Sequence, residues 1–276
     1  MNGRNNKTDR PPANPLLLVV KSWRPVTYFV IKFQNVFIRP IPAFGFMVLF
    51  HHGMTEMRKP GFIALILVIY LAGCTKEESD TVTDIDGNVY HTVKIGDQVW
   101  MAENLKVTGY RNGDSIPVVE GSQEWDELHS GAYCNMNNEG LTAAAFGHLY
   151  NWYAVSDKRG LCPPGWHVPS DNDWDVLIGY LGGEEVAGGK LKSTDSSFWK
   201  PPNTGAVDLV GFAGLPGGTR WDKGLFLYFG YYGLWWSSTA EDADFAWYRN
   251  LIYDNPACFR NHFRKNFGCS VRCIKD

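Results

Sequence analysis

The sequence predicts an α+β domain over residues 83–276, and three observations lead to this class. Short runs of alternating apolar and polar residues, typical of β-strands, lie near both ends of this region. Two segments with helical character lie between them, at residues 142–155 and 170–181. From residue 187 to 233 the chain is punctuated by Gly, Pro and Asn, which disfavours long regular elements. We therefore expect two helices, small antiparallel sheets and a long loop-rich region.

A β-hairpin is expected to open the domain. The run YHTVKI at residues 90–95 and the run QVWM at residues 98–101 both alternate. The Gly96-Asp97 pair that links them is typical of a tight primed turn, which matches the twist of the two flanking strands. The hairpin prediction therefore rests on both strands and on the turn.

The segment before the hairpin has the pattern Asp84-x-Asp86-x-Asn88, which raises a choice between a calcium loop and a turn. A calcium loop of the EF-hand kind needs a Gly at its sixth position and a Glu at its twelfth. This chain has Val89 and Ile95 there, so we favour a turn stabilised by the short polar side chains.

The helix at 170–181 carries the clearer signals. Ser170 is an N-cap candidate with Asp173 three residues later, and apolar residues follow at i, i+3, i+4 and i+7 until a Gly-Gly pair ends the pattern. The helix at 142–155 is predicted from its Ala and aromatic content. Late strands are expected at residues 234–239, 246–251 and 270–274.

The charge of the chain is divided unevenly. Residues 1–73 hold nine of the 26 Lys and Arg residues and two of the 29 Asp and Glu residues, so 17 basic and 27 acidic residues remain from Cys74 onward. The main body therefore carries a net charge of −10, without the basic surface that phosphate contacts need. We expect no nucleic-acid partner.

An apolar run at residues 61–73 ends at Cys74 and is too short to span a bilayer, which takes roughly 20 residues. Arg58 and Lys59 precede it, and Leu-Ala-Gly-Cys closes it. Residues 57–73 thus resemble a bacterial lipoprotein signal peptide, which implies lipidation of Cys74 as the mature N-terminus. The alternative is a buried segment with an incidental cysteine.

The flanking segments are interpreted from this signal. Residues 1–56 keep neither a strand alternation nor a helical period, and we interpret them as an upstream extension outside the natural protein, whose start would be Met57 or Met54. Residues 74–82 are polar and charged, as in a flexible tether. Lys-Glu-Glu behind Cys74 resembles a signal for the cell surface, and a plain solvated linker is the alternative.

A series of blocks in residues 83–276 carries a family resemblance. In order they read VYHTVKIGDQVWMAENL, FGHLYNWYAV, LCPPGWHVPSDNDWDVL, AGGKLK, GFAGLPGGTR, WWSST, AWYRNL and SVRCIKD. They resemble the Fibrobacter succinogenes major paralogous domain (FISUMP), which is related in fold to C-type lectin-like domains and to formylglycine-generating enzymes. The resemblance implies two helices, a small sheet joining both ends of the domain and a loop region carrying a second sheet.

Five cysteines follow Cys74, and export as a lipoprotein would place them in a compartment where disulfides persist. Cys162 and Cys273 stand in the two family blocks that carry cysteine, so the resemblance implies a bridge between them. Cys258 and Cys269 flank the segment FRNHFRKNFG and are expected to staple it as a loop. Cys134 would then be free.

The sequence shows no motif for a metalloprotease, a serine hydrolase, a phosphate loop or a Cys/His metal quartet. We therefore predict no catalytic residue, no metal and no cofactor. The resemblance leaves a copper oxidase through Cys269 and Cys273 as an alternative, although their spacing departs from that of formylglycine-generating enzymes. His167 is interpreted as a structural hydrogen-bonding residue.

A binding role fits this chain better. Ten of its eleven Trp residues lie in the domain, and aromatic rings can stack on sugars or anchor protein contacts. Core packing accounts for most of them. The predicted ligand-binding residues lie in the late loops and are Arg220, Trp221, Asp222, Tyr228, Tyr231 and Arg264. We expect a lipid-anchored binding or adhesion module of the outer membrane or cell surface, for a glycan or a protein, with a structural envelope protein as the alternative.

Overall fold

The structure is a computed structural model that describes residues 80–276. Its strands are β1 (Thr81–Thr83), β2 (Val89–Ile95), β3 (Gln98–Met101), β4 (Tyr133–Cys134), β5 (Leu149–Tyr150), β6 (Trp166–His167), β7 (Thr219–Arg220), β8 (Phe226–Leu227), β9 (Tyr232–Ala240), β10 (Phe245–Ile252), β11 (Asn255–Arg264) and β12 (Ile274–Lys275). Its helices are α2 (Ser122–Asp126), α3 (Gly140–Phe146), α4 (Trp152–Val155), α5 (Asp171–Tyr180) and α6 (Glu184–Leu191), with 3-10 turns η1 (Met136–Asn138) and η2 (Asp222–Gly224). The predicted α+β class is confirmed.

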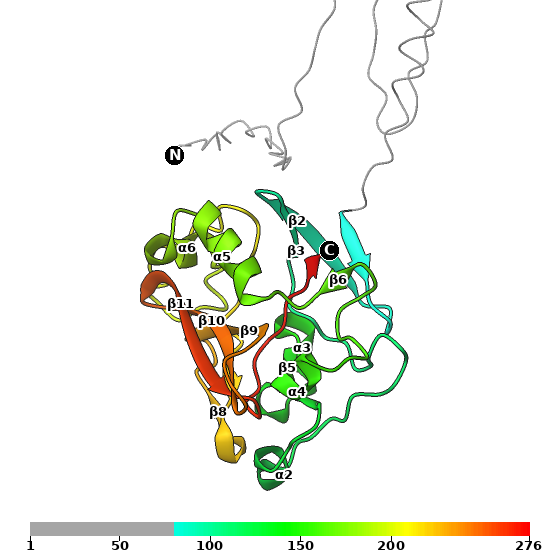
Figure 1. The fold of residues 1–276 in the computed structure, drawn as a ribbon. Helices are drawn as coiled ribbons and strands as arrows, with labels where there is room; N and C mark the ends of the chain where they lie inside the picture. The colour runs from blue at the N-terminus through cyan, green and yellow to red at the C-terminus, as the bar shows by residue number, and fades with distance from the viewer. Residues whose placement is uncertain (1–79) are drawn as a thin grey trace, which may run out of the picture. The chain divides into compact units, whose positions relative to one another are not determined.

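Two sheets organise the described part of the chain (Figure 1). The first has the strand order β1-β2-β3-β12-β6, so the first and last strands of the described chain lie in one sheet, as the family resemblance implied. The second has the order β11-β10-β9 and follows the loop-rich region. β4 pairs with β5 and β7 pairs with β8 in two short ribbons.

The predicted hairpin is confirmed. β2 and β3 pair in antiparallel register, with Ile95 opposite Gln98, and Gly96 takes a positive φ of 62° in the turn. The turn before the hairpin is also confirmed. Asp84 accepts hydrogen bonds from the backbone N–H groups of Asp86 and Asn88 at 3.0 and 2.9 Å, so its carboxylate stabilises the turn.

α5 begins where the sequence predicts it. The Ser170 hydroxyl accepts a hydrogen bond from the Asp173 N–H at 3.3 Å, and the Asp173 carboxylate accepts one from the Ser170 N–H at 2.8 Å. This reciprocal pair is a capping box. α5 buries Trp174, Leu177 and Ile178.

The predicted helix at 142–155 is wrong, because the segment breaks into α3, β5 and α4. Gly147 ends α3 with φ at 71°, and a Cβ there would lie 2.6 Å from the Leu105 carbonyl oxygen. The chain then turns into β5, which pairs with β4, and Asn151 caps α4 by accepting from the Ala154 N–H at 3.0 Å. Pairing with a distant strand therefore overrides the helical preference of the local sequence.

Two further differences concern α6 and β11, neither of which the sequence analysis predicted. α6 packs directly on β11, because a Cβ on Gly188 would lie only 2.0 Å from the Ala257 carbonyl oxygen. The segment read as a stapled loop is mainly β11, whose residues pair with β10 as far as Arg264. Of the predicted late strand at 270–274, only Ile274 belongs to a strand, β12.

Of the two predicted disulfides, one is confirmed and one is wrong. Cys162 and Cys273 form a disulfide, so the predicted bridge is confirmed. The predicted bridge between Cys258 and Cys269 is wrong, because both are free, buried thiols, as is Cys134. Cys258 belongs to the core cluster under α5 and α6, whereas Cys269 belongs to the cluster around Tyr150 and Trp236.

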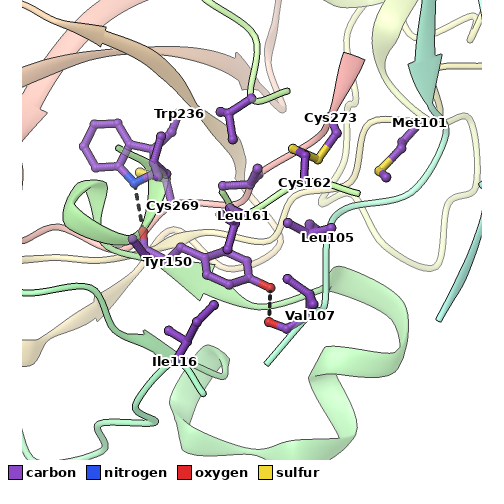
Figure 2. Close-up of a cluster of buried hydrophobic side chains, with 14 of the residues drawn as sticks. Met101, Leu105, Val107, Ile116, Tyr150, Leu161, Cys162, Trp236, Cys269 and Cys273 are labelled. Atoms are coloured by element: carbon purple, nitrogen blue, oxygen red, sulfur yellow. Dashed lines mark hydrogen bonds between the residues drawn. A yellow bond between two sulfur atoms is a disulfide. The ribbon is translucent and has the colours of Figure 1, made fainter. Parts of the chain in front are cut away.

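That second cluster is drawn in Figure 2. The Trp236 indole N–H donates to the Tyr150 carbonyl at 2.8 Å, and the Tyr150 hydroxyl donates to the Val107 carbonyl at 2.7 Å. The disulfide lies in the same cluster. Residues 75–276 form one compact unit that holds these cores, the sheets and the disulfide, as expected of a domain that folds by itself.

The predictions for residues 1–79, including the signal peptide and the lipidation of Cys74, lie outside the described residues. The predicted tether at 74–82 overlaps the structure at its end, where Thr81 already pairs with His91 in β1. Strand β1 therefore begins two residues before the predicted domain boundary at residue 83. Within residues 80–276 there is no helix with the length and apolar character that a bilayer crossing requires.

Candidate functional site

Five aromatic side chains gather beside the three-stranded sheet, and we call them the aromatic face: Trp221, Tyr228, Tyr232, Tyr248 and Phe263. The Tyr228 ring stacks on that of Tyr232 with centroids 4.5 Å apart, and the Phe263 ring stacks on that of Tyr248 at 4.1 Å. Trp221 links the two pairs, because its ring centroid lies 6.3 Å from that of Tyr228 and 6.4 Å from that of Phe263. The aromatic face is thus one continuous cluster.

The register of the sheet explains why three of these rings share one of its faces. Tyr248 of β10 lies between Asn261 of β11 and Trp236 of β9, and alternate residues along each strand share its face. Tyr232 and Phe263 fall on that same face. The segment around β8 lies beside the sheet (Figure 1) and brings in Trp221 and Tyr228.

Tyr228 has an unusual backbone. Its φ is 65°, in the left-handed region that bulky residues rarely adopt. Its carbonyl accepts hydrogen bonds from the N–H groups of Tyr231 and Tyr232 at 2.9 and 3.0 Å, and Gly230 donates to the Pro216 carbonyl at 2.9 Å. The ring is 37% exposed. The fold therefore holds an exposed aromatic ring in a strained conformation, a combination that points to a functional position.

Burial holds the hydroxyl groups of Tyr232 and Tyr248 in the protonated form, because it raises the pKa of both. Burial is the main cause that raises the pKa of Tyr248, and nearby Cys269, Tyr228 and Tyr232 raise it further. Burial also raises the pKa of Tyr232, followed by the effect of Tyr228. At neutral pH these phenols can both donate and accept hydrogen bonds.

Arg220 corrects the sequence-based site, because it is fully buried. Its guanidinium donates to the carbonyls of Val119 at 2.5 Å and of Glu120 at 2.7 Å, and it lies 4.5 Å from the Trp125 ring. These contacts hold the 119–121 segment against β7. Its Nε has no hydrogen-bond partner among the described residues, but it is buried with the rest of the side chain, so Arg220 is a structural residue out of reach of a ligand.

The other predicted residues are spread around the aromatic face. Trp221 and Tyr228 belong to it. Asp222 is half-buried and begins the η2 turn next to Trp221. Tyr231 is 42% exposed and meets Tyr253 edge-on at 5.2 Å. Arg264 lies over the Phe245 ring at 5.8 Å, on the opposite face of the sheet, so it does not join the aromatic face.

Sequence reasoning missed three members of the aromatic face, Tyr232, Tyr248 and Phe263. Tyr248 lies in a segment that was predicted as a strand, and alternation along it could have placed its ring on one face. Phe263 could not be found, because β11 was interpreted as a loop. The register between strands, which the local sequence does not contain, decides which rings meet.

The cysteine pair of the oxidase alternative does not gain support from the geometry. Cys273 is joined to Cys162, and burial raises the pKa of Cys269 far above the usual value of a thiol. A buried protonated thiol is a poor nucleophile and a poor metal ligand. Among residues 80–276 no group of three or more His, Cys, Asp or Glu side chains is placed to hold a metal ion.

His167 has two acidic partners that the sequence did not reveal. Its Nδ1 lies 2.7 Å from an Asp276 carboxylate oxygen, and its Nε2 lies 3.3 Å from the Asp173 carboxylate. Asp173 also belongs to the capping box of α5. His167 therefore ties the end of the chain to the start of α5, which agrees with the structural interpretation.

A hollow of about 430 Å³ lies elsewhere, on the five-stranded sheet. It is lined by threonines, by Lys94 and Lys275 and by Trp166, whose ring is almost entirely buried. The hollow has one aromatic residue with little accessible area, whereas in the aromatic face Tyr228 is exposed and Trp221, Tyr232 and Phe263 are only partly buried. We therefore place the candidate site at the aromatic face.

The fold and the site define a disulfide-closed α+β domain, with both chain ends in one sheet and a cluster of aromatic rings beside a second sheet. The chain belongs to the family described as the Fibrobacter succinogenes major domain, since the model of that family matches residues 93–275, more than half of the chain. No curated protein and no solved structure matches this chain. The relationship to lectin-like folds stays a prediction.

Proposed function

We propose that this chain is a lipid-anchored binding module of the bacterial outer membrane or cell surface, and that the aromatic face binds its ligand, a glycan or a protein. The observation that carries the proposal is Tyr228, an exposed ring in a left-handed backbone conformation within a cluster of stacked rings. Core packing alone does not account for a bulky exposed residue in that conformation.

The energetics support a binding role. Aromatic side chains provide large contact areas with few rotatable bonds, so they lose little conformational entropy when a ligand binds. Stacking and the backbone hydrogen bonds of the 228–232 segment already fix these rings. A ligand therefore meets a pre-organised surface, and most of the cost of ordering it has been met during folding.

The lipid anchor is supported by the sequence around Cys74, where a basic segment, an apolar run and Leu-Ala-Gly-Cys follow one another. The test is a Cys74→Ser variant expressed in a bacterial host fed labelled palmitate. We expect the natural sequence to incorporate the label and to sediment with membranes. Equal labelling of the two proteins would contradict lipidation at Cys74.

The binding test uses residues 75–276, immobilised and exposed to a glycan array and to solubilised envelope proteins. We expect a ligand whose retention falls at least tenfold in Tyr228→Ala. Tyr180→Ala is the matched control, since Tyr180 is 63% exposed on α5 and touches none of the rings of the aromatic face. Circular dichroism should show both variants folded.

A different result would favour a structural envelope protein. If the folded domain retains no glycan and no protein, or if retention is equal in Tyr228→Ala and in Tyr180→Ala, the aromatic face is not the binding site. A defect in envelope assembly without any captured ligand would then support the structural alternative.

A further inference from the structure

The three-stranded sheet carries its charged side chains on one face and only uncharged side chains on the other. Strand alternation and register place every ionisable side chain except Tyr on the face turned to α5, with Arg249 opposite Arg260 and Trp247 opposite His262. Arg249 and Arg260 both bind Asp171 there, at 2.9 and 2.8 Å. The other face is uncharged. Leu234, Trp236, Ala246, Tyr248 and Asn250 are buried on it, whereas Tyr232, Ile252, Phe259 and Phe263 are partly buried and Asn261 is exposed.

Two asparagines lie next to the aromatic face on that uncharged side. Asn261 is exposed and sits opposite Tyr248, while Asn250 is buried two residues further along β10. The Asn261 side-chain NH₂ donates to the Asn250 side-chain carbonyl at 3.0 Å. This bond fixes both amides and leaves the Asn261 carbonyl oxygen to accept from a ligand.

The charged side chains around the aromatic face either form hydrogen bonds within the protein or lie beside the face. Lys265, although it follows β11 directly, is buried and donates to the carbonyls of Asp242 and Ala243 at 2.7 and 2.8 Å. Asp222 and Lys223 follow Trp221 in the η2 turn, and Asp254 lies near enough to Tyr232 to raise its pKa. The centre offers amides, phenols and rings.

The mutual stacking of the rings also matters for ligand choice. Because the Tyr228 and Tyr232 rings lie face to face at an angle of 14°, each ring covers one face of the other, and Tyr228 is the more exposed of the two. Ring edges carry partial positive charge and attract oxygen atoms. A surface of this kind suits a ligand rich in neutral hydroxyl groups, with C–H patches to pack on a ring.

Building on the proposed function, we infer that the ligand of the aromatic face is an uncharged glycan. Phenol and amide groups, each a donor and an acceptor, match the hydroxyls of a sugar. An acidic or basic ligand would lose its hydration on this surface without finding an opposite charge at the centre, which is costly. The asparagine pair thus favours a neutral ligand over a charged one, while the rings provide the contact area.

The test measures the binding of residues 75–276 to neutral oligosaccharides of glucose, xylose and mannose, and to uronic-acid oligosaccharides of equal length, by isothermal titration. We expect binding of at least one neutral series and none of the acidic series. Tyr228→Ala and Asn261→Ala should each weaken that binding about tenfold. Arg264→Ala, on the opposite face of the sheet, should leave it unchanged.

The outcomes separate this inference from the proposed function. Tighter binding of the uronic-acid series, or a loss in Arg264→Ala equal to that in Asn261→Ala, overturns the neutral-glycan assignment. Binding of a purified protein through Tyr228 with no glycan bound also overturns it, yet leaves the binding module intact. If neither glycans nor proteins bind, both the inference and the proposed function fail.

Discussion

Three buried cationic side chains donate hydrogen bonds to backbone carbonyls that helices and sheets leave without a partner. The Lys192 ammonium donates to the carbonyls of Thr204, Ile252 and Asn255 at 2.7–3.0 Å, although burial lowers its pKa to about 8. Arg220 serves the 119–121 segment, and Arg272 donates to Asn104 at 2.9 Å and to Phe212. Buried carbonyls need partners, and in a loop-rich domain side chains provide them.

The same requirement explains why Arg220 was wrongly predicted as a ligand-binding residue. An arginine beside a tryptophan and an aspartate in a Gly-rich stretch fits a ligand site, and local sequence does not disclose that its partners lie about 100 residues earlier. Trp221 and Tyr228 are different, because an aromatic side chain in a loop is rarely required as a hydrogen-bond partner for backbone groups. Side-chain type therefore predicted the rings better than it predicted the charges.

His148 gives a residue-scale prediction about pH. Burial lowers its pKa to about 4, against 6.5 in an unfolded chain, so between these values the unfolded state binds a proton that the folded state does not. Stability should therefore fall as the pH drops from about 6.5 towards 4, with about 2 kcal/mol lost at pH 5. Urea unfolding at pH 7 and pH 5 measures this loss.

The matched variant for that measurement is His148→Gln, which keeps a polar side chain near the Asn135 amide that His148 contacts at 2.8 Å. Because glutamine does not titrate, the variant should lose less stability between pH 7 and pH 5 than the natural sequence. Equal losses in the two proteins would show that carboxylates elsewhere cause the acid sensitivity.

At the scale of elements, the sequence predicts those elements that depend on interactions between neighbouring residues. The β2–β3 hairpin and α5 were predicted because the turn pair and the capping box that form them lie within a few residues of each other in the sequence. α6 and β11 were missed because they depend on each other: Gly188 allows a close approach of the two elements that the local sequence does not indicate. Gly147 broke a predicted helix for a similar reason, since it touches the distant Leu105 carbonyl.

The contact between α6 and β11 can be tested by adding one methyl group. In Gly188→Ala the new Cβ would lie 2.0 Å from the Ala257 carbonyl oxygen, so α6 must shift away from β11. We expect a loss of about 3 kcal/mol in the free energy of unfolding. Chemical denaturation provides the measurement.

Gly179→Ala is the control for that substitution, since Gly179 lies in α5 and a Cβ there has no neighbour within 4 Å. Alanine should stabilise the helix by about 0.5–1 kcal/mol through its better helix propensity. If Gly188→Ala were also neutral or stabilising, the tight packing of α6 on β11 would be refuted.

At the scale of the whole domain, the Cys162–Cys273 disulfide joins the loop before β6 to the segment before β12. The two cysteines are separated by 111 residues, and both are buried in the core around Tyr150. Closing so long a loop removes much entropy from the unfolded chain, about 4–5 kcal/mol in the chain-entropy account. The Cys162→Ala/Cys273→Ala double variant should lose stability of this order in urea unfolding.

Reduction of the natural sequence under denaturing conditions should reproduce the loss of the double variant. A double variant as stable as the oxidised natural sequence would show that the bridge does not constrain the fold. Cys134, Cys258 and Cys269, being free and buried, are expected to resist alkylation in the folded protein in both cases.

The aromatic face is a property of the whole molecule, since its rings come from three strands and a loop that only tertiary pairing brings together. It is also where the domain departs from local preference, at Tyr228. A protein tolerates such a residue where function or the surrounding fold requires it. The central claim is therefore about where a ligand lies.

A structure of residues 75–276 with a bound glycan or protein ligand tests that claim most directly. The account predicts that the ligand contacts Tyr228 and at least one other ring of the aromatic face, with hydrogen bonds to tyrosine hydroxyls or to Asn261. A ligand seated instead in the hollow of the five-stranded sheet beside Lys94, with no contact to the aromatic face, would contradict it.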